Sequence, residues 1–226
     1  MKTLFILGGT GDIGKAIVKR FTDKGYTVIS PSRTELNLES RLSIEEYFKF
    51  ARFKQKIDVL IYCAGWNNPK LIKELTYADL DKANAINVTG LFGILQKILP
   101  GMVKAKKGYI LAISSLYGSF SREGRAAYVM SKHALNGLIK TTALEFGRYN
   151  IKVNTLSPGF VDTKMTRKNN SNAMIKQIEE RISLGHLAMP REIANIASFL
   201  CSLENTYITG QDIIVDGGYS IGGFQK

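Results

Sequence analysis

Short apolar runs alternate with longer segments of helical period along this chain of 226 residues. The apolar runs have the length of strands and are rich in Ile, Val and Leu, which is typical of strands buried on both faces. Strands that alternate with helices indicate repeated strand-helix-strand units, in which the helices cover a parallel sheet. The pattern therefore predicts an α/β fold with a doubly wound parallel sheet, its strands at 3–7, 27–30, 59–63, 109–114, 152–156 and 212–215.

Boundary signals place two of the intervening helices. Thr76 and Asp79 have the spacing of a capping box and predict the start of a long helix, which we expect to end before Pro100. Pro190 stands where a first-turn proline would open a helix over 191–201.

One domain over residues 1–226 is expected, because no repeat, low-complexity tract or linker interrupts the pattern. The stretch 164–189 lacks a strand signal and combines an asparagine-rich turn with a charged helical segment. A long segment of this kind beside a sheet is typical of a lid, and we predict that it covers a site.

Composition narrows the class of protein. With 45% hydrophobic and 22% charged residues the chain is ordinarily globular. No apolar run approaches the ~18 to 20 residues that cross a bilayer, and the N-terminus lacks the features of a secretory signal. A cytoplasmic protein without a membrane partner is expected. Cys63 and Cys201 stand in apolar settings without further ligands at metal spacing, so we predict core thiols and no metal site.

The formal net charge of +12 raises the question of an anionic partner. The basic residues are scattered, and no basic stripe with interleaved aromatic residues appears, so no nucleic-acid partner is expected. A solvated basic surface accounts for the charge. An anionic substrate or an acidic protein partner remains the alternative.

A glycine-rich turn follows the first predicted strand and leads directly into an amphipathic segment. Residues without side chains let the backbone approach a dinucleotide pyrophosphate, and free amides at a helix N-terminus favour its charge. Any tight turn between a strand and a helix can be glycine-rich, so the turn alone does not decide the function. Its sequence is Gly8-Gly9-Thr10-Gly11-Asp12-Ile13-Gly14.

A tyrosine and a lysine lie four positions apart within a segment of helical period, 126–145. Tyr128 and Lys132 therefore share one face of a helix. A tyrosine of ordinary pKa, about 10, is a poor acid at neutral pH, but a neighbouring ammonium group favours the phenolate and lowers that pKa. Ser115 closes the predicted strand 109–114, at the edge where open α/β sheets bind ligands.

These features, together with two later motifs, resemble the short-chain dehydrogenase/reductase family over nearly the whole chain. In that family the turn usually reads Gly-x-x-x-Gly-x-Gly. Gly8 and Gly14 match its first and last glycines, whereas Asp12 replaces the middle one, and we expect Asp12 to cap the following helix amides. The motifs that carry the resemblance are Tyr128-Val129-Met130-Ser131-Lys132, Pro158-Gly159 and Asp216-Gly217-Gly218.

The resemblance implies a Rossmann-like fold and a set of four catalytic residues. Tyr128 would donate the proton, Ser115 would orient the substrate oxygen, and Lys132 would lower the pKa of the tyrosine and hold the ribose. The backbone carbonyl of Asn87 would fix a water that links the lysine to solvent, although Asn87 alone would pass for a buried helix residue. Ser114 is expected to face the other side of the strand.

The same resemblance implies a nicotinamide dinucleotide. Ser32 and Arg33 follow the second strand, where no carboxylate stands to bind a ribose hydroxyl, so NADP(H) is favoured over NAD(H). Glu35 could reach the ribose and leaves NAD(H) as the alternative. The implied cofactor contacts are Gly8, Thr10, Gly11, Asp12, Ile13, Gly14, Ser32, Arg33, Asn37, Leu38, Ala64, Gly65, Tyr128, Lys132, Pro158, Gly159, Val161 and Thr163.

Two departures from the family pattern concern the cofactor end. The interval between the second strand and Asn37 is too short for the helix that most relatives place there, and Tyr62-Cys63 stands where the family usually has two asparagines. The expected function is an NADPH-dependent oxidoreductase that reduces a carbonyl group, with a 3-oxoacyl thioester on an acidic acyl carrier protein as one substrate. A sugar or small ketone is the alternative substrate.

A dinucleotide-sensing regulator is the rival of a different class, but it would be expected to have lost Tyr128 or Lys132. Apolar residues on more than one side of the long helices predict a homodimer or homotetramer, the latter being common in the family.

Overall fold

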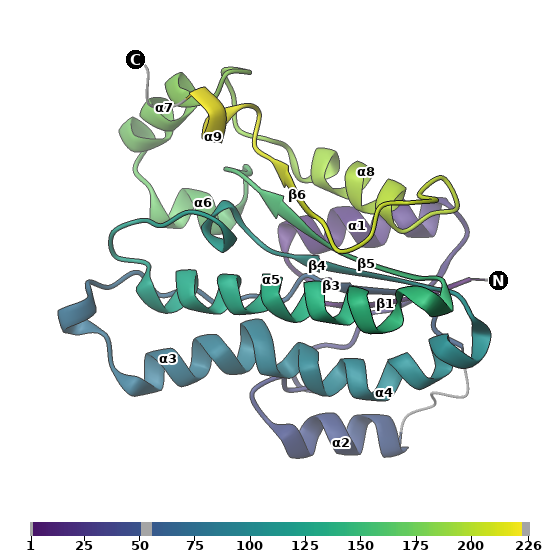
Figure 1. Cartoon of the computed structure of the whole chain (residues 1–226). Helices are drawn as coiled ribbons and strands as arrows, with labels where there is room; N and C mark the ends of the chain where they lie inside the picture. The colour runs from purple at the N-terminus through teal and green to yellow at the C-terminus, as the bar shows by residue number, and fades with distance from the viewer. Residues whose placement is uncertain (1, 51–55, 223–226) are drawn as a thin grey trace.

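A parallel sheet forms the centre of the computed structural model, which describes residues 2–50 and 56–222 (Figure 1). Within these residues six strands pair in the order β2-β1-β3-β4-β5-β6, so the predicted doubly wound parallel sheet is confirmed. Each strand lies within two residues of its predicted bounds: β1 Thr3–Leu7, β2 Thr27–Ile29, β3 Val59–Tyr62, β4 Gly108–Ile113, β5 Ile151–Pro158 and β6 Asp212–Val215.

Helices cover both faces because successive residues of each strand point to opposite sides. In β1, Leu4 and Ile6 belong to a core with the helices α1 and α8, whereas Phe5 and Leu7 belong to a second core with α2, α4 and α5. Figure 1 shows α1 and α8 on one side of the sheet and α4 and α5 on the other. The bounds are α1 Asp12–Asp23, α2 Arg41–Phe50, α4 Gly90–Ala105, α5 Ala126–Phe146 and α8 Pro190–Leu200.

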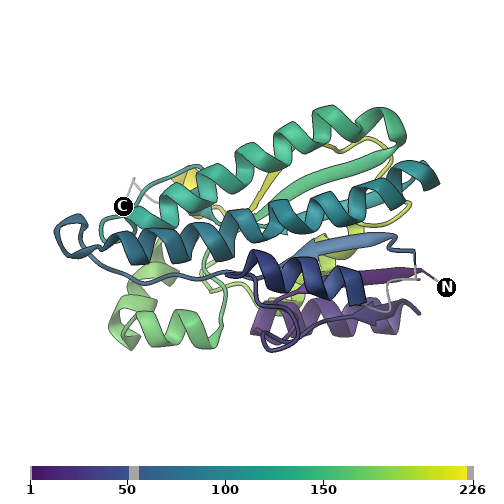
Figure 2. The same ribbon diagram turned by 90° about the horizontal axis from the view of Figure 1, so that it is seen from below.

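The long predicted helix begins where expected but ends later. Thr76 caps α3, Tyr77–Asn84, because its hydroxyl accepts a hydrogen bond from the Asp79 amide (3.2 Å). The helix α4 continues from α3, and together they form one long helical rod that lies beside α5 (Figure 2). The predicted end before Pro100 is wrong, because α4 runs to Ala105. Pro100 and Gln96 are both exposed, so the carbonyl that the proline leaves without a donor faces solvent.

The rod Tyr77–Ala105 is, by length and composition, apolar enough to cross a membrane. One helix of this kind is weak evidence of a membrane-spanning segment, because the core helix of a globular protein meets the same criterion. Leu91, Ile94 and Ile98 of this rod are buried against the sheet, as in the core helix of a globular protein.

The segment 164–189 folds as two helices beside the carboxyl ends of the strands. Its apolar side chains form a small cluster of their own with Phe160 and Tyr219. Figure 1 shows α9 next to this segment. The elements here are α6 Lys164–Asn169, α7 Asn172–Arg181 and α9 Tyr219–Gly222, and the short turns elsewhere are η1 Ile72–Glu74, η2 Ala85–Thr89, η3 Leu116–Gly118 and η4 Gly147–Tyr149. No helix separates β2 from Asn37, as the short interval predicted.

Candidate active site

The glycine turn packs against the end of β3 and leaves one side open. A Cβ atom on Gly8, whose φ is +79°, would lie 2.6 Å from the Ala64 nitrogen, and one on Gly14 would lie 2.1 Å from the Gly8 oxygen. At Gly11 the nearest atom is 3.6 Å away. The turn therefore requires glycine at both ends, while its middle presents bare backbone and the first amides of α1.

A cleft of about 410 Å³ begins at this turn. It runs along the carboxyl ends of β1, β3, β4 and β5, next to the point where strand order reverses around β1, which is where open α/β sheets bind ligands. Fifteen of the expected site residues line it: Gly8, Thr10, Gly11, Asp12, Ile13, Gly14, Ala64, Gly65, Ser115, Tyr128, Lys132, Pro158, Gly159, Val161 and Thr163.

Four expected cofactor residues lie outside this lining, in the loop after β2: Ser32, Arg33, Asn37 and Leu38. The Ser32 amide donates to the Glu35 carboxylate (2.7 Å), which holds that carboxylate within its own turn. Arg33 forms an ion pair with Glu39 (2.5 Å) and is 72% exposed. The structure thus gives the guanidinium a carboxylate partner where the sequence predicted a free donor.

The three residues with the strongest catalytic expectation surround one part of the cleft. Lys132 donates to the Ile113 carbonyl at the end of β4 (2.8 Å), and its Nζ lies 5.6 Å from the centre of the Tyr128 ring. Ser115 accepts a hydrogen bond from the Tyr117 amide (3.2 Å). Ser114 donates in another direction, to Asn136 (2.7 Å), as expected for its side of the strand.

Burial controls the protonation of the tyrosine and the lysine. Burial raises the pKa of Tyr128 to about 12, although a hydrogen bond with Ser115 acts in the opposite direction. Burial lowers the pKa of Lys132 to about 8. The lowered tyrosine pKa expected from the sequence is not found, because desolvation outweighs the favourable interactions and Lys132 hydrogen-bonds a carbonyl. At neutral pH Tyr128 therefore carries its proton.

Asn87 is fully buried and acts through its side chain in this structure. Its amide oxygen accepts from the Trp66 nitrogen (2.7 Å), and its amide nitrogen donates to the Trp66 carbonyl (2.9 Å) and to the Ser131 hydroxyl (2.8 Å). A Cβ atom on Gly65 would lie 3.7 Å from the Asn87 oxygen and 3.9 Å from the Lys132 nitrogen. Asn87 thus fixes the loop after β3 beside the lysine.

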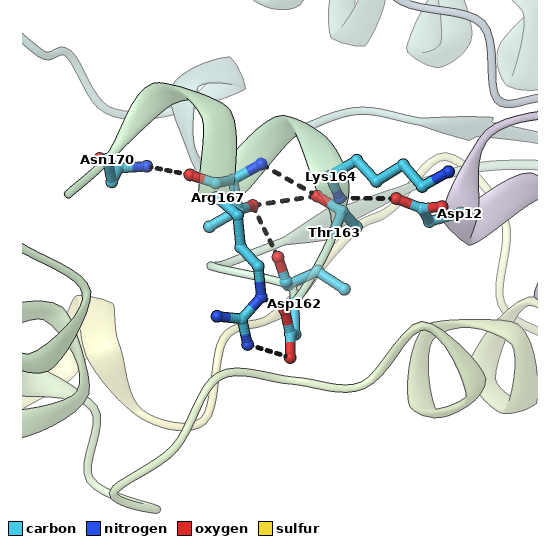
Figure 3. A network of polar contacts seen from close by, with 8 residues as sticks. Asp12, Asp162, Thr163, Lys164, Arg167 and Asn170 are labelled. Atoms are coloured by element: carbon cyan, nitrogen blue, oxygen red, sulfur yellow. Dashed lines mark hydrogen bonds and ion pairs between the residues drawn. The ribbon is translucent and has the colours of Figure 1, made fainter. Parts of the chain in front are cut away.

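Asp12 does not cap α1, contrary to the sequence expectation. Gly11 is the N-cap, and the Asp12 carboxylate instead accepts from the Lys164 amide at the start of α6 (2.7 Å; Figure 3). The same figure shows Arg167 paired with Asp162 (2.6 and 2.7 Å). The Asp12 carboxylate thus faces α6 and accepts a hydrogen bond there, so its charge is not directed at the place of a dinucleotide pyrophosphate.

Several residues of the cleft were not predicted as contacts. Cys63 is half-buried, where it packs against one core cluster and also lines the cleft, whereas Cys201 is buried as expected. The position of Cys63 directly before Ala64-Gly65 was the signal that could have placed it. The other unpredicted lining residues include Lys15, Trp66, Asn67, Lys164, Met165 and Thr166.

Comparison with known proteins finds relatives that match nearly the full length of the chain. A family model described as enoyl-(acyl carrier protein) reductase matches residues 30–220. The 3-oxoacyl-[acyl-carrier-protein] reductase of Thermotoga maritima is 34% identical over 242 residues, covering 97% of this chain and 98% of that protein.

Two similar solved structures contain nicotinamide dinucleotides. A 4-hydroxyisoleucine dehydrogenase mutant, complexed with NADH and succinate, is 30% identical with a TM-score of 0.92 and covers 98% of this chain and 99% of its own. ElxO with NADP bound is 27% identical with a TM-score of 0.88 and covers 97% and 98%. The chain belongs to the short-chain dehydrogenase/reductase family and is an oxidoreductase that acts on the alcohol-carbonyl couple with NAD(P).

Proposed function

We propose that this chain reduces a carbonyl group to an alcohol with NADPH. The observation that carries the proposal is the placement of Ser115, Tyr128 and Lys132 around one end of a cleft whose other end is the glycine turn. When bound there, the dinucleotide supplies the hydride. The residues of the chain supply the proton and the position of the substrate.

Each catalytic residue has a role that its surroundings support. Tyr128 keeps its proton at neutral pH, so it can donate that proton to the developing alkoxide. The Ser115 hydroxyl, hydrogen-bonded to the tyrosine, orients the same oxygen. Lys132 donates to the Ile113 carbonyl and would hold the ribose of the dinucleotide, and Asn87 holds the loop beside it through Trp66.

The glycine turn and the loop after β3 fit a dinucleotide. The open side of Gly11 and the first amides of α1 suit a pyrophosphate, and Ala64-Gly65 allows close approach of a ribose. NADP(H) is favoured and NAD(H) remains the alternative, in agreement with NADP and NADH in the solved relatives. Arg33 would exchange its Glu39 partner for the 2′-phosphate.

Two substrate classes have support. A 3-oxoacyl thioester on an acidic carrier is supported by the relative named above and by the net charge of +12. A small ketone or sugar is supported by a second cavity of only about 110 Å³ beside Tyr128. The proposal includes a single domain of residues 1–226, the segment 164–189 as a lid, a cytosolic location and a homodimer or homotetramer.

Replacement of Tyr128 by Phe tests the reaction. NADPH binding, measured by fluorescence titration beside NADH, should be unchanged, whereas NADPH oxidation with acetoacetyl thioesters and ketones should fall ~100- to 10,000-fold. Tyr149→Phe, in η4 and outside the cleft, is the matched control and should keep full activity. Retained turnover in Tyr128→Phe would contradict the assigned role, whereas a wild-type protein that binds NADPH but reduces none of these carbonyls would revive the regulator as an alternative.

A further inference from the structure

A second cavity, of about 110 Å³, adjoins the catalytic end of the cleft. Ser115 and Tyr128 line both spaces, so a carbonyl held by these two hydroxyl groups would extend its substituent into the smaller one. The loop that precedes α5 supplies two arginines, Arg122 and Arg125, to its wall. The described residues that line this cavity include no Asp or Glu.

Arg125 is a buried cation whose guanidinium has an unsatisfied nitrogen in the described part of the chain. The residue is 9% exposed, and its Nη1 atom is buried without a hydrogen bond within residues 2–50 and 56–222. Burial and the neighbouring Arg122 both act to lower the pKa of Arg125. A guanidinium that is removed from water without an acceptor costs free energy. A bound anion would supply the missing acceptor and would explain why an arginine is buried here.

The backbone holds this arginine in a defined place. Its carbonyl accepts from the Val129 amide in the first turn of α5 (2.8 Å), and the preceding Gly124 carbonyl accepts from the Lys70 amide (3.0 Å). The N-terminal amides of α5, a helix of 21 residues, add to the positive potential.

The rest of the cavity is also prepared for a polar ligand. Arg122 donates to the Tyr117 hydroxyl (3.2 Å), and the Tyr117 ring packs edge-on against the ring of Tyr128 (6.3 Å between centres). The amide oxygen of Asn67, which lines both spaces, is buried without a hydrogen bond in the described structure. Two cations thus face one small space beside the proton donor.

We propose that this cavity binds a carboxylate of the substrate, and that the chain reduces a short oxo acid with Arg125 as the anchor of its carboxylate. The inference rests on the proposed carbonyl reduction. In the reaction the ketone carbon gains a hydride from NADPH and its oxygen gains the proton of Tyr128, so a secondary alcohol and NADP⁺ form while the carboxylate is unchanged. The carboxylate and the guanidinium match as a pair of parallel hydrogen bonds.

Matched acids and amides test this inference, because each pair differs in charge and hardly in shape. The pairs are pyruvate and pyruvamide, acetoacetate and acetoacetamide, and levulinate and levulinamide, which place the carboxylate at three distances from the ketone. In the wild-type protein at least one acid should exceed its amide in kcat/KM by ~10- to 100-fold. Most of the difference should lie in KM.

Variants locate the effect. Arg125→Gln should remove most of the preference for the acid, and Arg125→Lys should keep part of it, since the charge stays but the forked geometry is lost. Arg191→Gln, exposed in the first turn of α8, should leave the preference unchanged. The wild-type comparison stands even where a variant fails to fold.

Each outcome separates this inference from the proposed function. Reduction of amides or acetoacetyl thioesters without any preference for an acid would overturn the inference and leave the reductase intact. If no carbonyl is reduced although NADPH binds, the proposed function fails, and thermal stabilisation of the NADP⁺ complex by each acid and amide then decides the inference. Acids that stabilise the complex no more than their amides would overturn it.

Discussion

Desolvation decides the behaviour of single residues in this active site. Lys132 is buried and Tyr128 is half-buried at the cleft, and desolvation shifts their pKa values in opposite directions, to about 8 and about 12. Both shifts favour neutral groups. A neutral phenol is the form that donates a proton to an alkoxide, so desolvation favours the state that reduction requires.

The lowered pKa of Lys132 predicts a pH-dependent stability. The lysine titrates near 8 in the folded chain and near 10.5 when unfolded, so its unfavourable contribution is fully present below pH 8 and disappears above pH 10.5. Relative to Lys132→Met, the wild-type protein should therefore gain about 3 kcal/mol of unfolding free energy across this interval. Urea denaturation at the two ends measures the change.

Lys140→Met is the control for this measurement, because Lys140 is exposed on the same helix. Its stability difference from the wild type should stay constant over the interval. A constant difference for Lys132→Met as well would show that this lysine titrates at its ordinary pKa.

At the scale of elements, a π-helical turn joins α3 to α4. In η2 the Gly90 amide bonds the Ala85 carbonyl five residues back, and the Tyr62 hydroxyl at the end of β3 donates to the Ile86 carbonyl (2.5 Å). A Cβ atom on Gly90 would lie 2.9 Å from this hydroxyl. Tyr62, which stands where the family usually has an asparagine, thus supplies a hydrogen-bond donor to a carbonyl of the turn that carries Asn87.

Tyr62→Phe should destabilise the fold, because the half-buried Ile86 carbonyl loses the hydrogen bond from the tyrosine hydroxyl. We expect the free energy of unfolding to fall by about 0.5 to 1.5 kcal/mol in urea denaturation. Tyr77→Phe, whose ring is 85% exposed in α3, should change it by less than about 0.5 kcal/mol. Equal stability of the Tyr62→Phe and wild-type proteins would show that the hydroxyl contributes nothing to the turn.

At the scale of the whole molecule, a hydrogen bond between Asp12 and Lys164 connects two sides of the cleft. Asp12 and Lys164 are 152 positions apart in sequence, and their contact ties the glycine turn to the first residue of α6 (Figure 3). The bond couples the cofactor end to the segment proposed as a lid.

Asp12→Ala should loosen α6, because the Lys164 amide loses its acceptor. We expect its hydrogen exchange to rise about tenfold, measured by mass spectrometry of peptides from this segment. Asp12→Asn keeps an acceptor oxygen and should keep the protection. Equal exchange in the wild type and Asp12→Ala would show that the bond does not hold the segment.

The sequence by itself determined the order of strands and helices, the cap at Thr76, the glycine turn and the shared face of Tyr128 and Lys132. These features depend on periodicity and on spacing within a few turns, which a chain carries locally. Only the tertiary structure decided which partner Asp12 takes, how Pro100 is tolerated, and that Arg125 is buried without an anion. Hydrogen-bond partners and desolvation depend on residues distant in sequence, so no local pattern specifies them.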